Sequence, residues 1–344
     1  MQSLNLRPRL LEAENFTPLR RTPWGGEAIA RMKGLGAGRL IGESWEISIE
    51  PDFPSRLEEG GLLLSDLFAA DPEAWLGKAA SIGASLLVKL LDARDDLSLQ
   101  IHPSDDDPAL GPEEGGKPEA WYIVDHAPGA GVYFGLSDEA TPLTIERALR
   151  GEGDLRELLR FHPVRRGDFF LVEPGVPHAV GAGVFLVEPQ RVLPGRRGIT
   201  YRYYDWNRRY DEAGRLSAEG KPRQLHLERA LAVTDFERPR GAPFDQATKR
   251  SLGSPILEGP LQMTTLSGTE PGLHSRHLFV ARIEGSGEAR FEKPLLLSGI
   301  TVVRGEIEIE GVRIEAGRSA VLPAALPFFT ARGERAEAIF SAVY

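Results

Sequence analysis

The chain has 344 residues, of which 41% are hydrophobic and 26% are charged, and its formal net charge is −9. This composition excludes a disordered chain, and the length is sufficient for two domains. Cysteine is absent, which excludes disulfides, thiolate metal sites and cysteine nucleophiles. Any bound metal must therefore use His, Asp, Glu or Gln side chains. The negative charge argues against nucleic acid as a partner.

No apolar run approaches the roughly 18 to 20 residues that a membrane-spanning helix needs. The N-terminal stretch "MQSLNLRPRLLEAENF" lacks the apolar centre of a signal peptide. We therefore expect a cytoplasmic protein with no membrane partner.

Short apolar runs separated by glycine, proline and aspartate predict a chain that is mostly β-strand. In chain order these runs are "ASLLVKLLD", "AWYIVD", "GVYFGL", "DFFLVEP" and "GVFLVEP". Two stretches, 62–79 and 141–163, have helical patterns instead. The second begins with Thr141 as a candidate N-cap before a proline, and the two glycines in "RGEGD" are expected to split it. Many short strands with few helices predict β-sandwich or barrel domains.

The domain boundary is expected in the segment 237–255, "ERPRGAPFDQATKRSLGSP", which is polar and contains proline and glycine. It divides the chain into a domain of residues 1–236, with the helical insertion, and a domain of residues 256–344.

A faint repeat links the two predicted domains. The segments "GDFFLVEPGVPHAV", from Gly167, and "GRSAVLPAALPFFT", from Gly317, both place a proline ten residues after the glycine. This order predicts a hairpin that is used twice. His178 follows the proline in the first copy, and Phe328 follows it in the second. Strand–turn–strand segments can look alike by chance. We favour a duplicated barrel whose second copy has lost a polar inward residue.

Four polar residues are candidates for one site. Gln100 and His102 alternate in "LSLQIHP", at the spacing that places side chains on one face of a strand. Glu119 precedes the run "AWYIV", and His178 follows the proline turn. Inward polar groups need a metal ion or a buried hydrogen-bond partner, and spacing alone leaves both open. Two histidines, a carboxylate and an amide suit a divalent metal. The other histidines are expected to be surface or structural residues: His126, His162, His226, His274 and His277.

Six segments between about residues 20 and 210 form a specific set: "RTPWGGEAIA", "IGESWEIS", "LLVKLLDARDDLSLQIHPSDD", "GGKPEAWYIVDHAPGAGVYFGL", "EPGVPHAVGAGVFLVEPQ" and "TYRYYDWNR". With these segments the chain resembles the type I mannose-6-phosphate isomerases (phosphomannose isomerases) of the cupin superfamily, in their short bacterial form. The resemblance implies a mainly β fold of two cupin jelly-roll barrels with a small helical insertion. The second barrel would be degenerate.

The resemblance implies that Gln100, His102, Glu119 and His178 bind one Zn²⁺ ion per chain, although these residue types would also accept manganese, iron or cobalt. It implies interconversion of mannose 6-phosphate and fructose 6-phosphate through an enediol. The partner is then a small sugar phosphate, and a monomer is compatible with the sequence.

Two cationic residues match catalytic positions of the family. Arg202 in "TYRYYDW" matches the arginine regarded as catalytic, with pairing to Asp205 as the structural alternative. Lys117 in "GGKPE" matches an active-site lysine that binds phosphate or assists proton transfer, with a solvent-exposed loop lysine as the alternative. A ligand His or Glu, Lys117 and a metal-bound water are all candidate bases.

The chain departs from the family between Gln190 and Tyr201. The family commonly has a short link with serine and aspartate there, whereas this chain has "RVLPGRRGIT". The link brings Arg191, Arg196 and Arg197 near the expected site, which suits an anionic substrate and could change the preferred sugar phosphate. Solvated surface arginines are the alternative.

Two other functions stay open from sequence. One is another metal-dependent cupin enzyme that acts on a related sugar phosphate, and the other is a sugar-phosphate-binding protein without turnover. A glutamine ligand disfavours an oxygenase, and the complete candidate set disfavours the loss of turnover.

Overall fold

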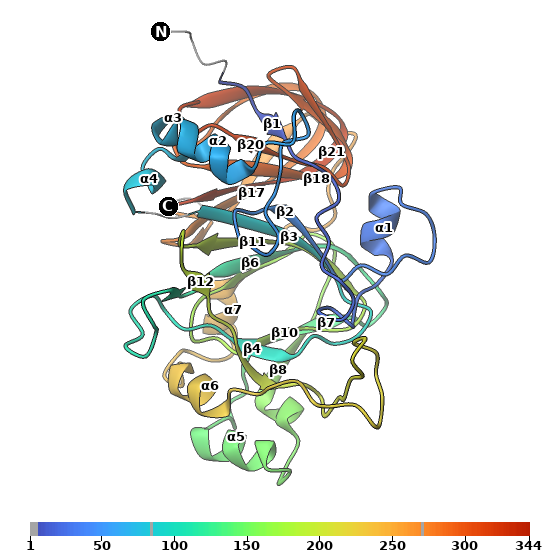
Figure 1. The fold of residues 1–344 in the computed structure, drawn as a ribbon, viewed down its shortest axis with the longest axis vertical. Coiled ribbons are helices and arrows are strands. Elements are labelled where there is room, and N and C mark those ends of the chain that lie inside the picture. Colours follow the sequence, from blue (N-terminus) through green and yellow to red (C-terminus); the bar gives the residue numbers. More distant parts are fainter. Residues whose placement is uncertain (1–5, 83–84, 270–271) are drawn as a thin grey trace.

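The computed structural model describes residues 6–82, 85–269 and 272–344. Three large β-sheets are stacked along the long axis of the molecule, which confirms the prediction of a mainly β protein (Figure 1). Within the described ranges, no helix is long and apolar enough to cross a membrane.

The six-stranded sheet lies in the middle of the stack and has the order β14-β9-β6-β11-β3-β2 (Figure 1). Its strands are β2 (Glu43–Ile47), β3 (Ser85–Asp92), β6 (Glu119–His126), β9 (Asp168–Val172), β11 (Val184–Val192) and β14 (Lys249–Ser251).

The five-stranded sheet packs against one face of the middle sheet and has the order β13-β4-β10-β7-β8. Its strands are β4 (Leu99–Ile101), β7 (Gly131–Leu136), β8 (Leu159–Pro163), β10 (His178–Val180) and β13 (Tyr201–Tyr204). A separate pair, β5 (Glu114–Gly115) and β12 (Arg197–Gly198), joins two loops in parallel.

The third sheet is built mainly from the C-terminal part of the chain, with the order β1-β20-β18-β21-β17-β15-β16, and β19 pairs with β18. Its strands are β1 (Arg9–Leu10), β15 (Gln262–Gly268), β16 (Leu273–His274), β17 (Leu278–Glu292), β18 (Ser298–Ile309), β19 (Val312–Glu315), β20 (Ser319–Leu322) and β21 (Phe328–Val343). The longest strands, β17, β18 and β21, enclose an apolar core of their own.

The middle sheet is buried on both faces, which explains why its strands are continuous apolar runs. Along β6, Trp121 and Ile123 point into the core shared with the five-stranded sheet, while Tyr122 and Val124 point into the core shared with the C-terminal sheet. This alternation follows from the two-residue period of a strand. It also fixes the face of Glu119, which has the same parity as Trp121.

The helices occupy the edges of the stack. They are α1 (Ala28–Met32), α2 (Leu64–Ala70), α3 (Pro72–Leu76), α4 (Ala79–Ile82), α5 (Pro142–Leu149), the 3₁₀ helix η1 (Leu155–Leu158), α6 (Leu227–Val233) and α7 (Ala242–Thr248). The helical stretch predicted over 62–79 is therefore confirmed, as the two short helices α2 and α3.

The second predicted helical stretch, 141–163, forms α5 and, after the two glycines, the 3₁₀ helix η1, as expected, and the prediction fails only at its end. Thr141 caps α5, since its hydroxyl accepts from the Thr144 backbone N–H at 3.1 Å, and Gly151 has a φ of 85°, which ends the helix. The prediction is wrong for 159–163, which form β8 and pair with β7. Tertiary pairing overrides the local helical pattern there.

The polar segment 237–255 is structured rather than an open connection. It forms α7 and then β14, which pairs with β9 of the middle sheet. Phe244 of α7 is buried and packs against Phe134. In addition, β1 near the N-terminus pairs with β20 of the C-terminal sheet. The division into 1–236 and 256–344 stays a prediction, and hydrogen bonds of the sheets cross between the two parts.

Both copies of the predicted repeat form a strand, a turn and a second strand, but the prediction of two hairpins is wrong. β9 and β10 belong to different sheets, and β20 and β21 each pair with β18 instead of with each other. Gly167 and Gly317 precede β9 and β20 with φ angles of 84° and 81°, which glycine adopts without strain. His178 is the first residue of β10, and Phe328 is the first residue of β21.

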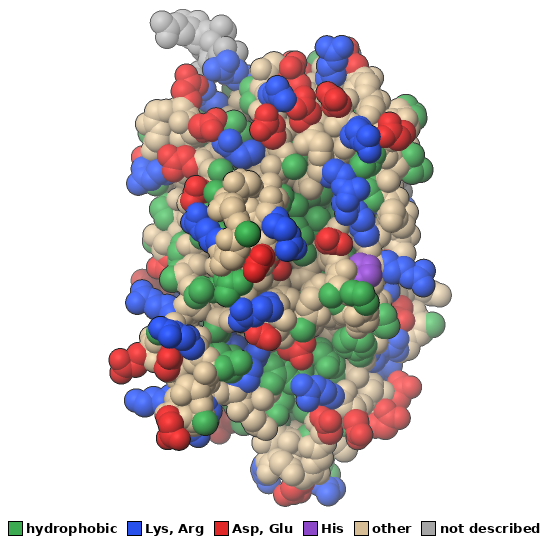
Figure 2. All heavy atoms as spheres, turned by 90° about the vertical axis from the view of Figure 1, so that its right-hand side faces the viewer, with side chains coloured by type: hydrophobic (Ala, Val, Ile, Leu, Met, Phe, Trp, Pro, Cys, Tyr) green, Lys and Arg blue, Asp and Glu red, His purple; other side chains and the backbone are tan. Residues whose placement is uncertain are grey.

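On the face shown in Figure 2, positive and negative side chains are interspersed, so this face offers no continuous basic surface to nucleic acid.

Candidate metal centre and active site

Three predicted residues meet between the middle and the five-stranded sheets. Glu119 begins β6, His178 begins β10, and His102 follows the last residue of β4. One ligand atom from each lies within 4.8 Å of the others, and all three side chains are buried. Among the described residues they are the one group of three such side chains that could hold a metal ion.

The backbone fixes which nitrogen of each imidazole faces this group. His102 Nδ1 lies 3.0 Å from the carbonyl of Ile199, and His178 Nδ1 lies 2.8 Å from the carbonyl of Val176. A carbonyl only accepts, so Nδ1 carries the proton in both rings and Nε2 keeps its lone pair. Second-shell carbonyls orient metal-binding histidines in this way.

Both Nε2 atoms are buried and have no hydrogen-bond partner among the described residues. They lie 3.3 Å (His102) and 3.5 Å (His178) from the oxygens of Glu119. Burial lowers the pKa of both histidines, that of His178 to about 3, so these contacts are not ion pairs. Lone pairs that face a carboxylate repel one another unless a cation lies between them. The donor set therefore fits a divalent metal.

Gln100 lies beside this group, as the strand alternation predicts. It pairs directly with His178 across β4 and β10, and its side chain lines the same small cavity of about 50 Å³. The amide Nε2 donates to Ser98 Oγ at 3.1 Å. This orientation leaves the amide oxygen available as a ligand.

Lys117 is part of the buried group rather than a solvent-exposed loop residue. Its Nζ lies 3.1 Å from Glu119 Oε2, and its side chain is 13% exposed. Burial lowers the pKa of Lys117, but Glu119 and Glu188 outweigh burial and raise it. Burial raises the pKa of Glu119, but the ammonium of Lys117 outweighs burial and holds this pKa well below its ordinary value. The ammonium and carboxylate are therefore both charged at neutral pH.

Sequence reasoning missed Glu188 and Gln190 on β11. Gln190 Nε2 donates to Glu119 Oε2 at 3.1 Å and also to Glu188, and Trp121 Nε1 donates to Glu188 Oε1 at 3.0 Å. Burial, followed by the charge of Glu119, raises the pKa of Glu188 to about 8. The alternation of two polar residues in "VEPQ" is the same signal that found Gln100 and His102.

Arg202 lies on the next strand, opposite Gln100 in the β13–β4 register. Its Nε donates to Ser98 Oγ at 3.1 Å, so Ser98 joins it to the Gln100 amide. Asp205, the alternative partner expected from sequence, instead binds Arg208 and Arg223, each at 2.6 Å. The structure thus places Arg202 beside the candidate site.

A larger cavity of about 870 Å³ lies beside the small one, and Lys89 and Lys117 line both. Arg196 and Arg197 line its outer part. Arg191 does not join them, because it is buried and paired with Asp105. The three-arginine cluster expected from sequence is therefore wrong for Arg191, which the strand period of β11 turns away.

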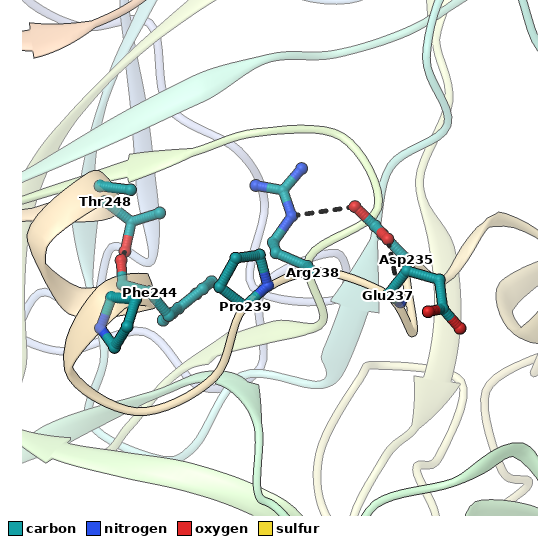
Figure 3. Close-up of a pocket in the computed structure, with 8 residues that line it drawn as sticks. Asp235, Glu237, Arg238, Pro239, Phe244 and Thr248 are labelled. Atoms are coloured by element: carbon teal, nitrogen blue, oxygen red, sulfur yellow. Dashed lines mark hydrogen bonds and ion pairs between the residues drawn. The ribbon is translucent and has the colours of Figure 1, made fainter.

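A separate hollow of about 370 Å³ lies beside α7 (Figure 3). Its arginine, Arg238, donates to Asp235 at 3.2 Å and to the carbonyl of Pro174 at 3.2 Å. Of the described residues that line this hollow, none belongs to the predicted site. The residues of the candidate site lie between the middle and the five-stranded sheets instead.

Comparison with known proteins agrees with this geometry. No family model matches the chain. The chain is 31% identical over 307 residues to the mannose-6-phosphate isomerase of Streptococcus mutans, covering 87% of this chain and 88% of that protein. This chain belongs to the mannose-6-phosphate isomerase family. A second member, mannose-6-phosphate isomerase ManA of Bacillus subtilis, is 31% identical over 287 residues and covers 82% of each chain.

Solved structures of the mannose-6-phosphate isomerase family share the fold. The crystal structure of mannose 6-phosphate isomerase from Bacillus subtilis superimposes with a TM-score of 0.74 and 26% identity, over 97% of this chain and 99% of the other. The agreement covers the C-terminal sheet as well as the barrel with the candidate site. It confirms the expected family and its cupin-type β fold.

Proposed function

We propose that this protein is a metal-dependent aldose–ketose isomerase that interconverts mannose 6-phosphate and fructose 6-phosphate. The observation that carries the proposal is the buried group of His102, Glu119 and His178, in which unpartnered lone pairs face a carboxylate. Membership of the family supplies the substrate class. Zn²⁺ is the proposed metal, and the Gln100 amide oxygen is the proposed fourth ligand, which would complete a set of nitrogen and oxygen donors.

When bound, the metal supplies Lewis acidity that polarises the oxygen atoms on C1 and C2 of the sugar. The chain's own residues must then stabilise negative charge as a proton leaves C1 or C2. Lys117 is charged and lies at this end of the cavity, 3.1 Å from Glu119. Its position supports a role at the reacting carbons more than a role at the distant phosphate. Arg202 adds a second positive charge beside Gln100.

Proton transfer also needs a group that holds a proton at neutral pH. Glu188 suits this role by position, because its side chain lines the small cavity together with Glu119 and His178, and burial raises its pKa above the ordinary value. Its hydrogen bonds from Trp121 and Gln190 fix its orientation in the cavity. We assign Glu188 as the acid that exchanges a proton with the sugar oxygens, with Gln190 as its link to Glu119.

A coupled assay that follows fructose 6-phosphate formation from mannose 6-phosphate tests the proposal. Activity should disappear with a chelator and return when Zn²⁺ is added. Glucose 6-phosphate serves as the matched substrate, since it differs only in the configuration at C2. Absence of turnover in metal-loaded protein that binds mannose 6-phosphate would instead indicate a binding protein. Turnover that is unchanged by complete metal removal would contradict the metal centre.

A further inference from the structure

The outer cavity contains the residues of the chain's unusual link. Residues Pro194 to Tyr201 line it, and Lys117 connects it with the metal group. When C1 and C2 of a sugar phosphate lie at Glu119, the rest of the molecule extends into this larger cavity. The phosphate is at the opposite end of the sugar from C1 and C2, so it must bind in the outer cavity.

Some of the positive side chains that line this cavity already form an ion pair with a carboxylate, and others do not. Four of the five are ion-paired: Arg21 with Asp52 at 3.1 Å, Lys89 with Glu43 at 3.8 Å, Lys117 with Glu119 at 3.1 Å, and Arg197 with Glu114 at 3.3 Å. Within the described part of the chain, Arg196 has no carboxylate within 4.0 Å. An unpaired guanidinium can bind an anion without first releasing a carboxylate.

The backbone that carries Arg196 is held in place. The N–H groups of Arg197 and Ile199 donate to the carbonyls of Glu113 and Gly115 at 2.8 and 2.9 Å, which forms the parallel β12–β5 pair. The N–H of Arg196 donates to the carbonyl of Leu193 at 2.9 Å and closes the turn. The position of Arg196 is therefore set by the loop, while its exposed side chain can adapt to a ligand.

The same segment reaches the metal group. The carbonyl of Ile199 accepts from His102 Nδ1, and the side chain of Lys117 packs against Gly198. Arg196 lies three residues before Ile199, and such a segment spans at most about 10 Å. This span is comparable with the length of a hexose phosphate. One loop thus touches both ends of the space that a substrate would occupy.

We propose that Arg196 is the residue that binds the phosphate group of the substrate, an inference that rests on the proposed function. The planar guanidinium can donate two parallel hydrogen bonds to phosphate oxygens, which gives both affinity and orientation. Arg196 is then a specificity-determining residue for phosphorylated sugars. It contributes equally to the ground state and the transition state, because the phosphate does not react.

The test compares Arg196→Ala with Arg197→Ala, the neighbouring arginine that Glu114 already neutralises. Arg196→Ala should raise KM for mannose 6-phosphate about tenfold or more, as expected for a lost charge-assisted hydrogen bond. Its kcat, metal content and unfolding midpoint should stay close to those of the wild type. Arg197→Ala should change KM by less than about twofold. Arg196→Lys should recover part of the lost affinity, because it keeps the charge but loses the fork.

An unchanged KM in Arg196→Ala, or a larger effect of Arg197→Ala, would overturn this inference while leaving the isomerase activity intact. A binding measurement, which does not require turnover, tests the role of Arg196 separately from the proposed function. Inorganic phosphate binding, measured by calorimetry on the metal-loaded protein, should weaken in Arg196→Ala and not in Arg197→Ala. Equal phosphate binding by the two variants would overturn the assignment even if the wild type has no isomerase activity.

Discussion

The segment that contains β9 and β10 and the segment that contains β20 and β21 share the order strand, turn, strand, but differ in chemistry. In the first, the strand after the proline turn begins with His178, which is buried and faces Glu119. In the second, it begins with Phe328, which is 42% exposed and lies under the guanidinium of Arg290. The core enclosed by β17, β18 and β21 is apolar. A shared fold therefore supports chemistry only where polar groups replace apolar packing inside it.

The first segment contains a buried nitrogen, His178 Nε2, which is unsatisfied without a cation. The second segment begins its second strand with an apolar residue, and this strand, β21, contributes to a large apolar face for the middle sheet. The middle sheet and the C-terminal sheet are also joined by buried polar contacts. The hydroxyl of Tyr122 on β6 donates a hydrogen bond to Glu337 on β21 at 2.7 Å. We therefore expect metal binding and catalysis to depend on the site around His178. The stability of the fold should depend on both this part of the molecule and the C-terminal sheet.

The largest effect is expected from His178→Ala. This change removes one imidazole from the metal group and should abolish both metal binding and isomerase activity, while the protein stays folded. Metal analysis and the coupled assay measure the two losses. His126→Ala is the control, because His126 contacts the carbonyl of Ala127 and lies outside the group. Stoichiometric metal in His178→Ala would show that the ligands lie elsewhere.

Arg202→Ala should lower kcat by roughly 10²- to 10³-fold, by analogy with the loss of an electrostatic partner of a developing oxyanion. KM should change little, because the interaction strengthens in the transition state. Arg202→Lys should recover only part of the rate, since it lacks the fork that binds Ser98 and the carbonyl of Gln224. Steady-state kinetics at saturating metal measure this. A near-normal kcat in Arg202→Ala would remove it from the catalytic residues.

Glu337→Ala should destabilise the whole protein by about 3–5 kcal/mol, as is typical when one partner of a buried ion pair is removed. It would leave the hydroxyl of Tyr122 without its acceptor and the guanidinium of Arg166 without its carboxylate. Denaturant unfolding measures the change. Glu258→Ala removes an exposed pair with Arg335 and should cost less than about 1 kcal/mol. Equal losses from the two changes would contradict the role of this interface.

Per pH unit, a smaller effect on stability is expected in the metal-free protein. His178 has a pKa of about 3 when folded, against an ordinary value of 6.5, because burial disfavours the charged ring. The unfolded chain takes up a proton below pH 6.5, so stability is complete above this pH and falls as pH decreases toward 3. The slope should reach about 1.4 kcal/mol per pH unit for this residue. His178→Ala should flatten it, and an unchanged slope would argue that His178 is not buried as a neutral ring.

The sequence predicted the elements that depend on local patterns. The alternation of Gln100 and His102 and the N-cap Thr141 follow from spacing within a few residues, and the structure contains both. The repeated order of strand, turn and strand is also present, but its strands do not pair as hairpins. The long apolar runs were also correct as strands. These features need only the period of a strand or the chemistry of a turn.

Features that depend on distant partners were missed. Glu188 resembles a strand-end carboxylate in sequence, but its partner Trp121 lies 67 residues away on the neighbouring strand. Arg191 belongs to the basic link in sequence, yet the continuation of β11 to Val192 buries it against Asp105. Residues 159–163 follow a helical pattern but pair with β7. In each case the environment of the residue depends on how its strand pairs with a distant strand. This register cannot be read from a single stretch of sequence.

The most direct test of the account is an anomalous difference map from crystals of the Zn²⁺-loaded protein, collected at the zinc absorption edge. One peak per chain is expected, surrounded by Nε2 of His102, Nε2 of His178 and a carboxylate oxygen of Glu119, with the Gln100 amide oxygen as the fourth ligand. The region that contains Phe328 should show no peak. A peak within residues 256–344, or a single peak remote from Glu119, would contradict the assignment of the metal centre.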